Sequence, residues 1–239
     1  MWKIRAEQEA AGLISLLASL AMIWVGPKLE GWGLGGQALA LLLSGVTFYG
    51  LYSGLAAFLA RRRLRHVLGK WIYFTWADQG RTQLRYGLMM FFFSEGRVLE
   101  YKVKLYDTVA QVLAASKARG GGAKMIGDAN SRALRVDEQN ERIYVLWEAD
   151  FLDKSEPKRY GRLILHMVNE NRMDGAWLSD PNAEGVSRGH MIAARPRVFE
   201  ASHDELIEDL MQQGALTRAD GKIVSAKALP ASGGGGSEQ

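Results

Sequence analysis

The chain has 239 residues, of which 48% are hydrophobic, and its 30 lysines and arginines against 26 aspartates and glutamates give a formal net charge of +4. It contains no cysteine, which excludes disulfides and thiolate metal sites, and the small basic excess does not by itself indicate nucleic-acid binding. The charges are unevenly distributed, because none occurs between Glu9 and Lys28 or between Glu30 and Arg61. We therefore expect two parts in different solvents.

Two apolar stretches near the N-terminus have the length of membrane-crossing helices, which need about 20 apolar residues. The first covers residues 10–25 and the second residues 36–60, with a Pro- and Gly-rich connection between them. A signal peptide is an alternative for the first stretch, although no small-residue cleavage site follows it. The pattern predicts a transmembrane helical hairpin over residues 1–66.

Basic residues directly follow the second stretch, at Arg61, Arg62, Arg63 and Arg65. Because positive residues stay on the inner side of a membrane, they predict that both termini are cytoplasmic. Within the second stretch Gly50 and Gly54 are four residues apart on one helical face, a spacing that suits packing within the hairpin or self-association between subunits.

From Gly69 onward, short runs rich in aromatic and β-branched residues alternate with turn signals. Eight candidate strands cover residues 70–77, 83–93, 98–106, 131–136, 142–151, 160–168, 172–178 and 186–195. Such a series predicts an up-and-down antiparallel barrel over residues 67–197, with room for one small ligand. The expected fold class is an α+β membrane protein: a two-helix transmembrane hairpin followed by a cytoplasmic eight-stranded antiparallel β-barrel.

Two stretches read as helices instead. Residues 108–118 form a short one before a run of three glycines, and residues 202–213 begin with a capping box of Ser202 and Glu205. Residues 198–239 are thus expected to be a C-terminal helix and a flexible tail, whose last residues, SGGGGSEQ, have the composition of a linker.

Searches for catalytic and metal-binding motifs give no match. The three glycines before Lys124 lack the spacing of a phosphate-binding loop, the four histidines form no metal-binding pair, and no nucleophile motif occurs. We therefore expect no enzymatic activity, no cofactor and no metal site.

Aromatic and basic residues share faces of several predicted strands, where they could stack on a base and pair with phosphate. On this ground we predict a ligand-binding site formed by Tyr73, Tyr144, Arg162, His166 and Trp177, with Tyr144, Arg162 and His166 on one inward face. The alternative is that these groups form the solvent-facing side of the barrel.

A pattern of glycines and tryptophans follows the two apolar stretches and the basic junction in the sequence. It occurs in four short segments, at residues 69–73, 161–163, 174–177 and 188–190. In this arrangement the chain resembles the two-transmembrane, β-strand-rich effectors of bacterial antiphage systems that signal with cyclic oligonucleotides. The resemblance covers about residues 8–196, whereas the helix at 108–118 and the tail after Arg195 depart from it.

The resemblance implies a multi-pass protein of the bacterial inner membrane. Its cytoplasmic barrel would sense a nucleotide second messenger, cyclic or linear, and control homo-oligomerisation of the helices, with pore formation or other damage to the bilayer. It implies no binding of long nucleic acid and leaves open whether the ligand activates or inhibits. The alternative function is a non-enzymatic, membrane-anchored scaffold that binds a protein or lipid.

Overall fold

The structure is a computed structural model that describes residues 11–15, 17, 31, 34–78, 83–94, 98–118, 123–153, 158–179 and 188–226. Its internal contacts divide the chain into two compact units, Met1–His66 and Val67–Gln239. The second unit therefore includes both the strand series and the segment that follows it. Each unit is described by itself.

The first unit contains one long helix, α2 (Leu34–Arg63), of 30 residues. Its last turn carries Arg61, Arg62 and Arg63, whose charges are favourable near the carbonyl end of a helix. A Cβ atom added at Gly50 or Gly54 would meet nothing within 4 Å, so no described segment packs closely against that face.

The expected transmembrane hairpin is wrong as a description of this unit. Within the described ranges, no helix is both long and apolar enough to cross a membrane. In α2 the apolar residues are interrupted by glycine, serine, threonine and tyrosine, and the helix ends in three arginines. Most of the first predicted span, residues 10–25, and most of the predicted connection lie outside the described residues.

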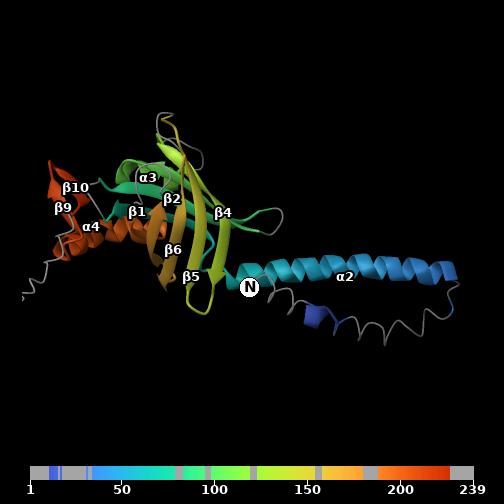
Figure 1. The fold of residues 1–239 in the computed structure, drawn as a ribbon. Coiled ribbons are helices and arrows are strands. Elements are labelled where there is room, and N and C mark those ends of the chain that lie inside the picture. Colours follow the sequence, from blue (N-terminus) through green and yellow to red (C-terminus); the bar gives the residue numbers. More distant parts are fainter. Residues whose placement is uncertain are drawn as a thin grey trace, which may run out of the picture. The chain divides into compact units, whose positions relative to one another are not determined.

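The second unit is built on eight antiparallel strands that close into a barrel, each paired with the next and β8 paired with β1 (Figure 1). This part of the predicted fold is confirmed. The strands are β1 (Gly69–Ala77), β2 (Arg85–Phe93), β3 (Leu99–Tyr106), β4 (Gly127–Asp137), β5 (Arg142–Phe151), β6 (Arg159–Asn169), β7 (Arg172–Ser179) and β8 (Arg188–Ala194). Closure leaves no unpaired edge.

One end of the barrel interior is filled with apolar side chains. They come from the beginning of β1, β5 and β7 and the end of β2 and β6, and none is more than 1% exposed: Trp71, Met89, Phe91, Ile143, Leu165 and Met173. At this end the Arg195 guanidinium lies over the Trp71 ring, 3.9 Å from its centre, and donates a hydrogen bond to the Leu68 carbonyl. The filled end cannot admit a ligand without rearrangement.

Large aromatic side chains in the rest of the interior lie opposite glycines of the neighbouring strand. The pairs are Tyr73 with Gly87, Trp147 with Gly161, and Trp177 with Gly189. A Cβ atom at Gly87 would collide with the Tyr73 ring. Each glycine therefore leaves space for the inward-pointing aromatic ring of the residue paired with it on the adjacent strand.

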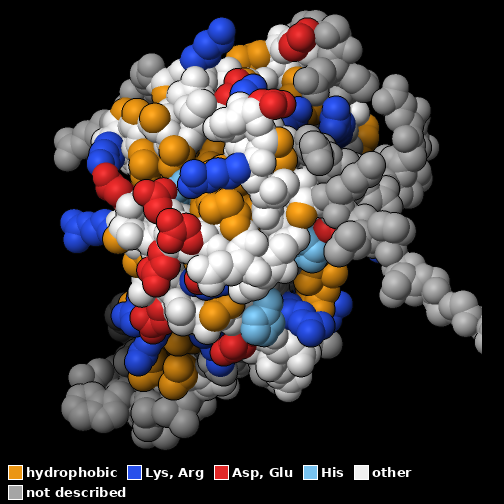
Figure 2. Space-filling model, turned by 90° about the vertical axis from the view of Figure 1, so that its left-hand side faces the viewer, with side chains coloured by type: hydrophobic (Ala, Val, Ile, Leu, Met, Phe, Trp, Pro, Cys, Tyr) orange, Lys and Arg blue, Asp and Glu red, His pale blue; other side chains and the backbone are white. Residues whose placement is uncertain are grey.

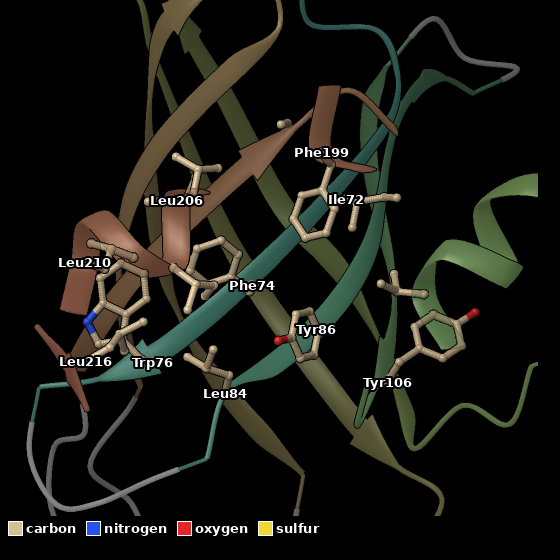
Figure 3. Packing of buried hydrophobic residues seen from close by; sticks show 14 residues of the cluster. Ile72, Phe74, Trp76, Leu84, Tyr86, Tyr106, Phe199, Leu206, Leu210 and Leu216 are labelled. Carbon is tan, nitrogen blue, oxygen red and sulfur yellow. The ribbon is translucent and has the colours of Figure 1, made fainter. Parts of the chain in front are cut away.

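The outer face of β1 and β2 is covered by a second layer, α3 (Val109–Lys117), α4 (Pro196–Gln212), β9 (Leu216–Ala219) and β10 (Lys222–Ser225). In Figure 3, Phe199, Leu206 and Leu210 of α4 point toward Phe74 and its neighbours on β1. The Phe199 ring meets the Phe74 ring edge-on, with 6.2 Å between their centres. Strand β1 is consequently buried on both faces.

The helical predictions are confirmed in part. Helix α3 begins with a complete capping box between Thr108 and Gln111. Helix α4 begins at Pro196, so the predicted start at Ser202 is wrong, and the Ser202 hydroxyl donates to the Val198 carbonyl inside the helix. Proline suits the first helical turn because it has no N–H to satisfy there.

Candidate ligand-binding site

The unfilled end of the barrel encloses a cavity of about 540 Å³. This volume lies within the range of about 300–1,000 Å³ that small-molecule sites occupy. All eight strands contribute to its lining, which is mostly apolar and rich in aromatic rings. The aromatic and aliphatic residues that line it include Tyr73, Tyr101, Leu105, Trp147, Phe151, Leu163, Trp177 and Met191.

Two arginines stand at the strand ends that form the mouth of this cavity, Arg85 at the start of β2 and Arg159 at the start of β6. Their guanidinium carbons lie 5.6 Å and 5.4 Å from the centre of the Phe151 ring. Cation–π contact with one ring holds two positive charges close together. The mouth can therefore attract and pair with an anionic group.

The hydroxyls of Tyr73 and Tyr101 lie deeper in the barrel. The two side chains are only 3% and 4% exposed, and both line the cavity. Burial raises the pKa of both phenols, and at Tyr73 the charge of Arg85 partly opposes the shift. Both therefore remain neutral hydrogen-bonding groups at physiological pH.

A short hydrogen-bond chain fixes one aromatic wall of the cavity. The Trp177 indole N–H donates to the Thr75 hydroxyl at 2.5 Å, and that hydroxyl donates to the His190 carbonyl at 2.7 Å. With its N–H satisfied in this way, the Trp177 ring is positioned on β7 by β1 and β8. A preorganised ring offers a stacking surface with little entropy to lose.

The structure brings two of the five predicted site residues to the cavity. Tyr73 and Trp177 line it. Tyr144, Arg162 and His166 instead lie on the outer face, because the alternate residues of β5 and β6, among them Val145 and Leu163, point inward. The prediction that those three share an inward face is wrong, since the polar set of each strand faces solvent.

The sequence reasoning missed Arg85, Arg159, Tyr101, Trp147 and Phe151. A signal was present for Arg159, which is in phase with the inward apolar residues of β6 and not with its polar ones. Strand β2 gave no such signal for Arg85, because both alternating sets of its residues are apolar. A charged residue in an apolar phase at the end of a barrel strand marks the rim of the interior.

A second cavity, of about 600 Å³, lies between α4 and the β6–β7 turn. Polar and charged side chains, including Glu170, Arg172, Glu205 and Asp209, make up most of its lining, and no aromatic ring contributes to it. On the face shown in Figure 2, basic and acidic side chains are interspersed with apolar ones. The barrel cavity is therefore the better candidate for binding a small molecule.

Within the described part of the chain, no three histidine or acidic side chains gather where they could hold a metal ion. The polar side chains of the cavity lining are instead two arginines, two phenols, the carboxylate of Asp107 and a few hydroxyl and amide groups. This set can bind and orient an anion, and it offers hydrogen bonds to a neutral polar group.

No family model matches this chain, and no curated protein matches it. Among solved structures, a redesigned beta barrel matches with 13% identity and a TM-score of 0.35, over 56% of this chain and 95% of its own length.

Proposed function

We propose that this protein binds a small anionic molecule with a flat aromatic body, of the nucleotide class, in the cavity of its barrel. The observation that carries the proposal is the pair Arg85 and Arg159, both over the Phe151 ring at the cavity mouth, beside an aromatic interior. Guanidinium groups pair with phosphate, and indole rings stack on bases of any sequence.

The size and chemistry of the cavity support this proposal over a purely structural barrel. A barrel of eight strands can be filled completely by side chains, as the opposite end of this one is. Here the aromatic rings of Trp147 and Trp177 line an unfilled volume instead. Binding without chemistry is the simplest use of such a site, and the proposal includes no catalytic step.

The proposed binding would allow the chain to sense a nucleotide signal, which is the role that the sequence resemblance implies. Participation in antiphage defence, placement at the bacterial inner membrane and homo-oligomerisation stay predictions from that resemblance. The alternative, a scaffold that binds a protein or lipid, does not require the two arginines at the mouth.

The experiment is a titration of the purified full-length chain with mononucleotides and cyclic dinucleotides, in which binding is measured by tryptophan fluorescence and by calorimetry. A charge-assisted hydrogen bond contributes about 1.5–3 kcal/mol, so Arg85→Ala and Arg159→Ala should each weaken binding about tenfold or more. Arg162→Ala is the matched control, because this arginine lies on the outer face of the same barrel.

Binding that depends on Arg85 and Arg159 and not on Arg162 supports the proposal. If no nucleotide binds, or if only Arg162→Ala weakens binding, the proposed site is wrong.

A further inference from the structure

Two residues that line the cavity, Tyr73 and Tyr101, carry phenol hydroxyls and stand several residues away from the strand ends at its mouth. Among the residues that the structure describes, none forms a hydrogen bond with either hydroxyl. Both side chains are more than nine-tenths buried. Neither hydroxyl is among the buried side-chain atoms that lack a partner in the described part of the chain, so both are open to water or to a ligand in the cavity that their side chains line.

These hydroxyls lie well inside the mouth. On β1, Tyr73 is two inward-facing positions from Ala77 at the strand end, and on β3 Tyr101 is two such positions from Leu105. Four residues of strand correspond to about 13 Å along its axis. Arg85 pairs with Thr75, one inward-facing position from Tyr73, so its backbone lies about 7 Å closer to Tyr73 along the strand than Tyr73's distance from the strand end would suggest. The cavity therefore has a cationic mouth and, further in along the same aromatic walls, neutral hydrogen-bonding groups.

An apolar ligand would suit such a cavity poorly. Solvent that enters the open cavity can bond with both hydroxyls, and a ligand that displaces it without replacing its hydrogen bonds loses affinity. A phenol is both donor and acceptor, so the carbonyl, ring nitrogen or amino group of a nucleobase can satisfy it.

We infer that the ligand enters base first, so that Tyr73 and Tyr101 hydrogen-bond the edge of the base while its phosphate stays at the mouth with Arg85 and Arg159. This inference rests on the proposed function and adds a selectivity to it. The two tyrosines distinguish a nucleobase from an aromatic ring of similar shape that has no polar edge.

The test compares two probes on the full-length chain, adenosine or uridine monophosphate and 1-naphthyl phosphate, which has an anion and a flat ring but no polar inner edge. Tyr73→Phe combined with Tyr101→Phe should weaken binding of at least one nucleotide about tenfold or more. The same variant should leave naphthyl phosphate within about twofold of the parent or bind it more tightly. Tyr144→Phe, on the outer face, is the control.

The outcomes separate the two ideas. If Arg85→Ala weakens neither probe, the proposed function itself fails. If both probes depend on Arg85 but respond equally to the phenylalanine substitutions, or do not respond, the site stands and the base-first orientation is wrong. Circular dichroism and the melting temperature of each variant show whether a lost affinity reflects a lost fold.

Discussion

The opposition of Tyr73 and Gly87 inside the barrel predicts a substitution whose effect changes sign with its partner. A Cβ atom at Gly87 would collide with the Cε1, Cζ and hydroxyl atoms of the buried Tyr73 side chain. Overpacking an interior costs about 1–3 kcal/mol, whereas alanine is better than glycine within a strand by about 0.5–1 kcal/mol. We therefore expect Gly87→Ala to lower the free energy of unfolding by about 1–2 kcal/mol.

In a Tyr73→Leu background the three colliding atoms are absent, so Gly87→Ala should become neutral or stabilising by about 0.5 kcal/mol. The measurement is a double-mutant cycle from the urea unfolding of the four proteins, monitored by fluorescence and circular dichroism. The four unfolding curves should have equal m-values, so that the free energies can be compared. A cost of Gly87→Ala that is the same in both backgrounds, within about 0.5 kcal/mol, would refute the reasoning.

Gly161 provides a contrast within the same barrel. A Cβ atom there would collide with the backbone carbonyl oxygen of Leu178 and would lie 2.5 Å from the nearest Trp147 ring atom. Trp147→Leu removes the ring but not the carbonyl, so Gly161→Ala should stay destabilising in that background. The two cycles together separate a collision with a side chain from one with the backbone.

Two further predictions concern the outer layer. Phe199→Ala should lower the free energy of unfolding by about 3–5 kcal/mol, because the Phe199 ring is completely buried where α4 packs on β1. The control is Val198→Ala at the exposed neighbouring position, which should change the free energy of unfolding by less than about 0.5 kcal/mol. Similar losses in the two variants would contradict this packing. Burial, with a smaller effect of Asp204, raises the pKa of Tyr86 to about 12 from 10.0, so the folded state keeps a proton that the unfolded state loses. The contribution of Tyr86 to the free energy of unfolding should be fully present below pH 10 and should be lost between about pH 10 and 12. In Tyr86→Phe the melting temperature should therefore fall less steeply with pH over this window. An unchanged slope of melting temperature against pH would argue against the prediction.

The number, order and pairing of the barrel strands could be predicted from the sequence. Alternating or short apolar runs separated by turn residues are local signals, and most connections are short, which favours pairing of each strand with the next. Strands β3 and β4 also pair, although residues 107–126, including α3, lie between them. The start of β4 at Gly127 was missed because Gly127, Asp128 and Asn130 are poor strand formers, but both neighbouring strands pair with them. The β9–β10 hairpin was also missed, although its turn contains Asp220-Gly221, a strong hairpin signal, with both residues at positive φ.

The inward or outward direction of each strand face was decided only by the tertiary structure. On β1 both faces are apolar, because α4 covers the outer one, so periodicity could not assign Tyr73 and Phe74 to opposite sides. The site depends on closure in the same way, since Arg85, Phe151 and Arg159 come from three strands and meet at one rim. Local sequence fixes which residues alternate along a strand, whereas only packing between distant segments determines which of the two alternating sets encloses the cavity.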